Sequence, residues 1–191
     1  MKRLLTLFII LFFILGVKSV YAQVSPEPSV SELKIPSATQ TANNTAVQYD
    51  LPYPGILPDN PLYFLKVVRD NLLGLFITDP LKKASYDLLM ANKRLVSARG
   101  LIDEGKTDLA ITTLSKSGNY FDQAISKAYE AKNQGEDANP VLSNLITAAK
   151  KHQEVIEQMV QKTKGDTKTT IRLLKERAHD FEQRVLIIQA Q

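Results

Sequence analysis

Apolar residues recur at alternating steps of three and four from residue 80 to the end of the chain. Four stretches show this spacing, at about 80–104, 107–134, 139–164 and 167–190. Such an alternation places one apolar stripe along a helix, which is typical of helices that pack against other helices. No comparable stretch alternates with a period of two, so we expect helices and no sheet.

The boundaries between these stretches are typical helix ends. Three dipeptides place a capping residue before a proline, which favours a helix start: Asn60-Pro61, Asp79-Pro80 and Asn139-Pro140. Three glycines are expected as C-terminal caps: Gly105, Gly135 and Gly165. A shorter helix at about 61–76 precedes the four long ones. Because the turns are short, we predict an all-α fold, an up-down-up-down four-helix bundle with the shorter helix across one end or side.

Two local features qualify this picture. Residues 115–119 form a weak patch within the second long helix, and its Gly118 predicts a kink or a break there. Residues 49–60 are rich in proline, so they are expected to be an extended lead-in whose apolar residues lie along the helical body. The helical domain is therefore predicted to span 49–191.

The preceding residues, 23–48, have a different composition. Fifteen of these 26 residues are Pro, Ser, Thr, Asn or Gln, and none is aromatic. Such a segment buries too little apolar surface to offset its ordering entropy, so we predict a disordered linker.

The first 22 residues have the pattern of a secretory signal peptide. Two basic residues precede an apolar run at 4–17, and a small-x-small pattern ends at Ala22. Cleavage after Ala22 would leave Gln23 as the first residue and an exported protein. The alternative is a retained membrane anchor, but a spanning helix needs about 20 apolar residues and this run is shorter.

Removal of the signal changes the charge balance. The full chain has 24 basic and 20 acidic residues, a net charge of +4. Without Lys2, Arg3 and Lys18, 21 basic residues remain against 20 acidic ones. A nearly neutral domain gives no reason to expect nucleic-acid binding, and membrane contact is expected only through an uncleaved N-terminal segment. The absence of cysteine excludes disulfides, thiolate metal sites and a cysteine nucleophile.

Two motifs resemble a known family. The first runs from Leu57 to Lys66 (LPDNPLYFLK) and the second from Thr78 to Ala84 (TDPLKKA), followed by Arg94-Leu95 and Gly105-Lys106. Residues 49–128 thereby resemble the bacterial family known as domain of unknown function 5667. The residues that define the resemblance are Pro58, Asp59, Pro61, Tyr63, Phe64, Lys66, Asp79, Pro80 and Lys83. The resemblance implies an exported helical envelope protein and brings no catalytic residues.

Residues 100–107 match the phosphate-binding pattern GxxxxGK[ST]. That loop requires a buried strand before it, whereas a charged amphipathic helix is predicted here. Asp103 and Glu104 would also repel phosphate. We therefore interpret the segment as a turn between two helices, with Gly105 as the C-cap.

His152 and His179 are the two histidines, and an antiparallel hairpin of the last two helices would place them at one level. With Glu154 or Glu182 they are candidate metal ligands. Their faces differ, because His152 lies on the apolar stripe and His179 at its edge. The favoured interpretation is a hydrogen-bonded histidine in the helix seam and a second one on the surface, with no metal and no cofactor, since metal sites need three or four converging ligands.

No catalytic motif accompanies these features, and no catalytic residue is assigned. We expect a non-enzymatic, exported helical protein of the bacterial cell envelope that binds an envelope protein or polymer through a helix face. The apolar stripes leave a homo-oligomer open. The alternative is an extracytoplasmic sensor that binds a small ligand or a metal.

Overall fold

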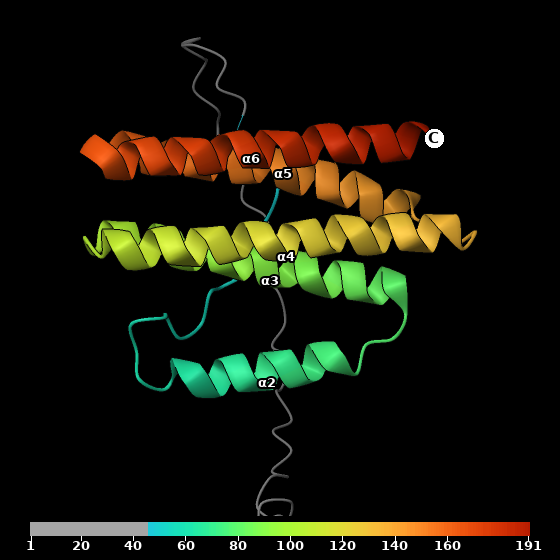
Figure 1. Ribbon diagram of the computed structural model, residues 1–191, viewed down its shortest axis with the longest axis horizontal. Coiled ribbons are helices and arrows are strands. Elements are labelled where there is room, and N and C mark those ends of the chain that lie inside the picture. Colours follow the sequence, from blue (N-terminus) through green and yellow to red (C-terminus); the bar gives the residue numbers. More distant parts are fainter. Residues whose placement is uncertain (1–45) are drawn as a thin grey trace, which may run out of the picture. The chain divides into compact units, whose positions relative to one another are not determined.

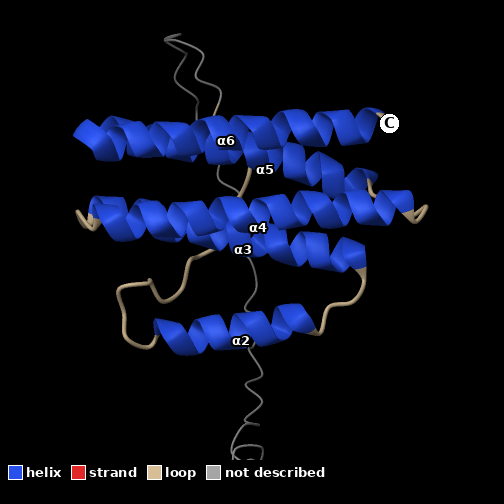
Figure 2. Ribbon diagram, in the orientation of Figure 1, coloured by secondary structure: helices blue, strands red, loops and turns tan. Residues whose placement is uncertain are grey.

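The computed structural model describes residues 46–191; the predicted signal peptide, its cleavage site and the linker up to residue 45 lie outside this range. The described chain forms five helices and no strand (Figure 2). They are α2 (Tyr63–Leu75), α3 (Pro80–Asp103), α4 (Thr107–Asn133), α5 (Asn139–Lys162) and α6 (Gly165–Ala190). The predicted all-α fold and its helical bundle are confirmed. None of these five helices combines the length and hydropathy that crossing a bilayer requires.

The four long helices are two antiparallel hairpins packed side by side (Figure 1). One hairpin is α3 with α4, and the other is α5 with α6. Between the hairpins, α5 packs on α3 and α6 packs on α4. The order around the bundle is therefore α3, α4, α6, α5, so the consecutive helices α4 and α5 occupy diagonal corners. The shorter helix, α2, lies alongside α3.

The core forms along the predicted stripes. At its centre the rings of Phe121 and Phe181 stack with centroids 4.8 Å apart, and His152 meets Phe121 edge-on at 4.9 Å. The large side chains that are fully buried include Leu95, Leu101, Ile125, Leu142, Leu145, Met159, Ile171 and Val185. This apolar cluster runs through α3, α4, α5 and α6 and lies within residues 84–185. The described part of the chain thus has its own continuous core and is able to fold by itself.

Three of the six predicted caps are present: Asp79, Gly105 and Gly135. The side chain of Asp79 accepts a hydrogen bond of 3.0 Å from the main-chain N–H three residues on, with Pro80 at the first helical position. Gly105 and Gly135 have positive φ angles of 76° and 83° and end α3 and α4. The prediction for Gly165 was wrong, because α5 ends at an extended Thr163 and Gly165 is the first residue of α6.

The starts of α2 and α6 lie two residues from the predicted positions, and the N-cap residue of α5 differs from the predicted one. The shorter helix begins at Tyr63, because the side-chain oxygen of Asn60 accepts a hydrogen bond from the N–H of Leu62 and closes a turn first. The helix predicted to be capped by Asn139 has Ala138 at its N-cap, and Asn139 is already helical. These shifts of one or two residues leave the architecture unchanged.

The predicted kink or break at residues 115–119 is absent, because α4 is continuous through them. Gly118 provides space for a neighbouring side chain instead. A Cβ atom there would lie 2.9 Å from Nη1 of Arg177 on α6. The adjacent Ser117 is buried and donates a 2.8 Å hydrogen bond to the main-chain oxygen of Ala91 on α3. Small residues at this point thus let α4 lie close to two other helices.

The lead-in segment, residues 46–62, includes the predicted extended stretch 49–60 and is non-helical and partly packed on the bundle. Its contacts start at Val47, whose N–H donates to the Glu154 carboxylate on α5 at 2.9 Å. The hydroxyl of Tyr49 accepts a 2.7 Å hydrogen bond from the Asn92 side chain on α3. These bonds fix the lead-in across α3 and α5 before the chain reaches α2.

Candidate functional site

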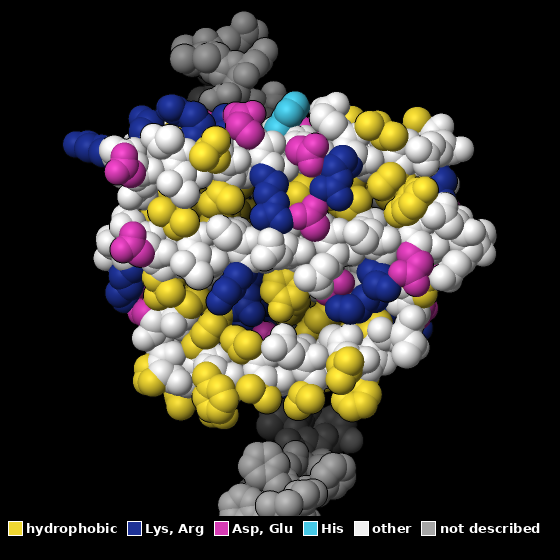
Figure 3. Space-filling model, viewed as in Figure 1, with side chains coloured by type: hydrophobic (Ala, Val, Ile, Leu, Met, Phe, Trp, Pro, Cys, Tyr) yellow, Lys and Arg dark blue, Asp and Glu magenta, His cyan; other side chains and the backbone are white. Residues whose placement is uncertain are grey.

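Helix α2 presents its apolar residues to solvent. Leu75 and Phe76 are exposed by 76% and 78%, although apolar helix residues in a bundle are normally buried. Eight large apolar residues, here called the outer face of α2, are exposed: Leu62, Phe64, Leu65, Val68, Leu72, Leu73, Leu75 and Phe76. The two residues that α2 buries are Asp70 and Gly74. Figure 3 shows hydrophobic side chains gathered over α2 along the lower edge of the molecule.

The sequence of α2 explains this orientation. At about 100° per residue, Asp70 and Gly74 fall on one side of the helix together with Tyr63, and the outer face occupies the other side. The small and polar side is turned toward α3, where a close approach is possible. A Cβ at Gly74 would lie 2.9 Å from Cε1 of Tyr86 on α3. The helix is therefore held by its polar side, which is the reverse of an ordinary bundle helix.

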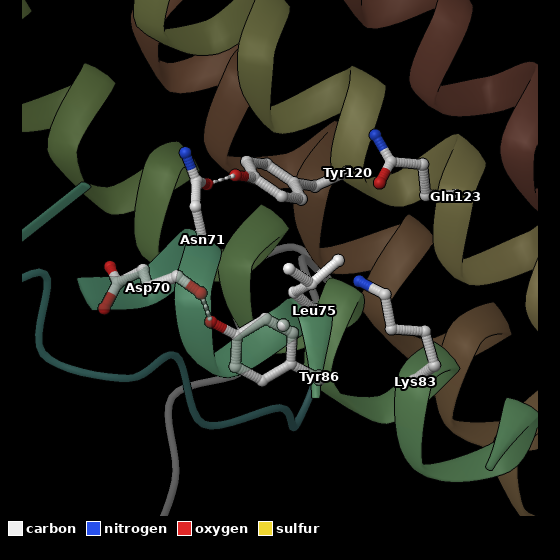
Figure 4. A pocket seen from close by; sticks show the side chains of 8 residues that line it. Asp70, Asn71, Leu75, Lys83, Tyr86, Tyr120 and Gln123 are labelled. Atoms are coloured by element: carbon white, nitrogen blue, oxygen red, sulfur yellow. Dashed lines mark hydrogen bonds between the residues drawn. The ribbon is translucent and has the colours of Figure 1, made fainter. Parts of the chain in front are cut away.

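Hydrogen bonds and aromatic contacts fasten this polar side. The Tyr86 hydroxyl donates to the main-chain oxygen of Asp70, as the dashed line in Figure 4 shows. The guanidinium of Arg94 on α3 lies 5.2 Å from the ring centre of Tyr63 and 5.7 Å from that of Tyr120. Arg94 is only 5% exposed, so these cation–π contacts act in a desolvated place, where they are strongest.

A groove of about 400 Å³ separates α2 from α3 and α4. It is lined by Asp70, Asn71, Gly74, Leu75, Lys83, Tyr86, Tyr120 and Gln123 (Figure 4). Beside it, the Lys83 ammonium lies 2.6 Å from Oδ1 of Asp87, and burial raises the pKa of the Asp87 carboxyl. The Oδ2 atoms of Asp70 and Asp87 are buried without a hydrogen-bond partner. The groove is thus a polar seam beneath the apolar outer face.

Several of the motif residues that suggested a family hold this region together. Lys66 donates to the main-chain oxygens of Pro54 and Ile56 in the lead-in, and burial lowers the pKa of its ammonium. Asp59 forms an ion pair with Lys106 in the turn after α3. Phe64 is the exception, because it is 64% exposed on the outer face of α2. The motif therefore attaches the lead-in and α2 to the bundle and leaves an apolar surface outside.

The phosphate-binding pattern at residues 100–107 forms a turn between two helices, as interpreted from sequence. Residues 100–103 are the last turn of α3, and Gly105 and Lys106 donate main-chain hydrogen bonds back to Ile102 and Leu101. Lys106 pairs with Asp59 and Glu104. No strand precedes this segment in the described part of the chain.

The two histidines are not brought together. His152 is completely buried, and its Nε2 lies 2.8 Å from Oδ1 of Asn92. Burial lowers the pKa of His152 to about 3, so the ring is neutral and Nε2 donates to Asn92. His179 lies on the exposed surface of α6. Residues 46–191 contain no group of three or more side chains arranged to hold a metal ion.

Sequence reasoning assigned no role in positioning α2 to Asp70, Tyr86 or Arg94, although Arg94 is one of the residues of the family resemblance. The sequence contains only an indirect signal of their role. The stretch 63–75 has a wide apolar side that is interrupted by Arg69, and Asp70 and Gly74 fall opposite. That pattern identifies an amphipathic helix, but apolar sides normally face a core. A second stripe of α3 is what reverses the expectation, because beside Met90 it buries the polar residues Asp87, Arg94 and Ser97.

These features define a class: a four-helix bundle protein that carries an additional helix with its apolar side outward. Comparison with protein-family models identifies the family. The chain belongs to the family described as "Domain of unknown function (DUF5667)", whose model matches residues 55–182. The match extends beyond the stretch recognised from sequence and includes α5 and most of α6. The comparisons with curated proteins and with solved structures gave no match.

Proposed function

We propose that this protein is a non-enzymatic, exported docking module of the bacterial cell envelope, which binds another envelope component through the outer face of α2. The observation that carries the proposal is the reversed orientation of α2. Soluble monomers rarely expose a contiguous apolar patch larger than a few hundred Å², and larger patches mark interaction sites. Six large apolar side chains of this short helix, and one more at each of its ends, are exposed.

The attachment of α2 also supports docking. Rotation of α2 by half a turn would place its leucines against α3. The opposite side is held there instead, because Tyr86 packs on Gly74 and bonds to the main-chain oxygen of Asp70. Arg94 in turn lies over the ring of Tyr63. Because this attachment uses specific polar contacts, the exposed leucines are the consequence of a fixed orientation. A fixed apolar surface is pre-organised, which reduces the entropy lost on binding.

Export rests on the sequence of residues 1–22, and it has its own test. Fractionation of cells that produce the full chain, followed by mass spectrometry of the N-terminus, is expected to find Gln23 as the first residue outside the cytoplasm. A chain that remains in the cytoplasm and begins at Met1 would contradict export.

Docking is tested by retention on a native envelope fraction. Residues 23–191 are titrated onto the fraction, and the bound protein is measured after sedimentation. We expect saturable binding that the double variant Leu65→Glu/Leu72→Glu reduces at least ten-fold. The matched control is Leu173→Glu, which places the same charge at an exposed leucine of α6. Equal retention of all three proteins would contradict docking through α2.

The alternative of a sensor that binds a metal through His152 gains no support from this geometry. The imidazole is enclosed by Phe121 and bonded to Asn92, and His179 lies on the surface. A metal would have to displace the Asn92 bond inside the core. Calorimetry with divalent metals on the wild type and on His152→Ala distinguishes this alternative from docking.

A further inference from the structure

We infer that Arg94 binds an oxyanion, the carboxylate or phosphate group of a small ligand that occupies the groove between α2, α3 and α4. Two observations support this site. The N–H donors of the Arg94 guanidinium have no acceptor, and the groove begins at one of the two rings that hold it. The site is separate from the outer face of α2, so it goes beyond the proposed docking function.

Arg94 is the one Lys or Arg side chain that is buried within residues 46–191. None of the ion pairs in this part of the chain includes it. The rings of Tyr63 and Tyr120 attract its charge through their faces, but they give no acceptor to the N–H groups in the guanidinium plane. Nε of Arg94 is accordingly enclosed without a hydrogen-bond partner. Because buried polar groups are normally hydrogen-bonded, these donors point to a ligand.

The two buried carboxylates of the α2–α3 layer are bonded to other cations. Oδ1 of Asp70 lies 2.7 Å from Nη2 of Arg69, and Oδ1 of Asp87 lies 2.6 Å from Nζ of Lys83. Each of these pairs is neutral as a whole, so the charge of Arg94 is left over. Buried charges normally have a partner of opposite charge, and the partner that is missing here is an anion.

Two lysines add positive charge around Arg94. Nζ of Lys66 lies 5.5 Å from the centre of the Tyr63 ring, which Arg94 also contacts. Burial lowers the pKa of Lys66; Asp70 opposes this shift, and the charge of Lys93 adds to it, so the two lysines are neighbours. Lys66 donates to main-chain oxygens of the lead-in, which leaves its charge without a carboxylate. A local surplus of positive charge attracts anions to the site.

The groove gives the rest of a ligand its place. Tyr120 lines the groove and contacts Arg94, so the guanidinium lies directly behind this wall. The volume of about 400 Å³ is within the range of small-molecule pockets. The Tyr120 hydroxyl is held by one long hydrogen bond of 3.5 Å to Asn71, so the ring can shift to admit an anion. In Figure 4 the carboxylate of Asp70 points away from Tyr120 and does not oppose that anion.

The chemistry of the guanidinium selects the ligand class. Its N–H groups form a planar fork that matches two oxygens of a carboxylate or a phosphate. The two rings hold this fork in a fixed orientation, which reduces the entropy lost on binding. Carboxylate and phosphate share this recognition, and the experiment distinguishes them.

The test is an NMR titration of purified residues 23–191 that follows the side-chain Nε–H signal of Arg94. Sodium phosphate and sodium acetate are compared with sodium chloride at equal ionic strength. Because Nε is enclosed, its proton exchanges slowly with water and the signal should be observable. We expect phosphate or acetate to shift the signal in a saturable way and chloride to leave it unchanged. The anion that binds more tightly identifies the group on the ligand.

Variants separate recognition by the fork from simple charge. Arg94→Lys lacks the Nε–H signal, which assigns it, and should bind the preferred anion at least ten-fold more weakly, measured by the rise of the urea midpoint. Arg99→Gln is the matched control, since it removes a half-buried arginine of the same helix and should bind like the wild type. Leu65→Glu/Leu72→Glu should also bind the anion like the wild type, so failure of docking and failure of this site are distinguishable.

An Nε–H signal that moves with neither phosphate nor acetate would overturn the inference, because water would then be the partner of this donor. Equal movement with chloride would overturn it as well, since it would show a general effect of salt. Equal affinity of Arg94→Lys would exclude recognition by the guanidinium fork. The wild-type titration decides the question even where a variant fails to fold.

Discussion

Oδ1 of Asn92 on α3 lies 2.8 Å from Nε2 of His152 on α5, and the amide of the same Asn92 donates to the hydroxyl of Tyr49 in the lead-in. One asparagine side chain thus connects three segments that are far apart in sequence. Because all three groups are partly or fully removed from water, each depends on the others for its hydrogen bonds. The stability of the bundle should therefore respond to changes in any of them.

The first prediction concerns pH. The pKa of His152 is about 3 in the folded protein and about 6.5 in an unfolded chain, so between these values the unfolded state binds the extra proton. Stability is then lost as the pH falls below 6.5, by about 1.4 kcal/mol per pH unit. Urea unfolding at pH 7, 6 and 5 measures this slope. His152→Gln should flatten it, and His179→Gln should not; identical slopes for wild type and His152→Gln would contradict the assignment.

A second prediction compares two glycines within helices. Gly74→Ala places a methyl group 2.9 Å from the Tyr86 ring, which cannot move freely because its hydroxyl is bonded to Asp70. We expect α2 to loosen, which is seen as faster hydrogen exchange in residues 63–75. Gly118→Ala meets the guanidinium of Arg177, which can shift only by weakening its hydrogen bonds to Asn119 and Asp122, so the gain in helix propensity of up to about 1 kcal/mol should offset only part of the cost and α2 should not be affected. Faster hydrogen exchange of residues 63–75 in Gly118→Ala, but not in Gly74→Ala, would contradict this account.

The third prediction addresses the aromatic clamp around Arg94. Arg94→Ala removes both cation–π contacts and the packing of the arginine stem, which should lower the free energy of unfolding by about 2 kcal/mol. Arg94→Lys keeps the charge but loses the planar guanidinium that lies over the rings of Tyr63 and Tyr120, so an intermediate loss is expected. Chemical denaturation gives both values. An Arg94→Lys protein as stable as the wild type would show that charge alone suffices.

The fourth prediction concerns Asp122, which joins α4 to α6. Its carboxylate accepts hydrogen bonds from Arg177 and Arg184, and all three side chains are about one-third exposed. Asp122→Ala should reduce stability by about 1 kcal/mol, and added salt should narrow the difference, because partly exposed pairs are screened. Asp180→Ala is the control, since Asp180 is more exposed and reaches only Arg184, at 3.4 Å. A loss for Asp122→Ala that does not change with salt would point to packing instead.

The local spacing of apolar and capping residues was enough to predict most of the helices. The stripes that include Leu95, Phe121 and Met159 are buried as spacing predicts, because apolar residues at steps of three and four must share one side of a helix. Asp79 and Gly105 also act where predicted, since capping depends on nearby main-chain groups. The prediction that Gly165 caps α5 failed because only two residues, the first of them the extended Thr163, separate α5 from α6. They leave no room for a glycine cap before α6 begins.

The candidate site was harder to predict. Spacing shows that α2 is amphipathic, but which side faces the bundle depends on contacts with α3 between residues 12 or more positions apart in sequence. Tyr86 bonds to Asp70, and Arg94 lies against Tyr63, so the polar side of α2 has specific partners. Hydrophobicity alone predicts the opposite orientation, because it does not include these contacts.

The sequence by itself determined the helices, their approximate ends and the residues of the core, since these follow from periodicity and capping within one segment. Only the tertiary structure decided that α4 and α5 lie on a diagonal, that Asn92 satisfies His152, and that α2 shows its leucines to solvent. The physical reason is that these features depend on contacts between segments. A polar side chain such as that of His152 lies where a partner exists, and that partner is placed by the fold.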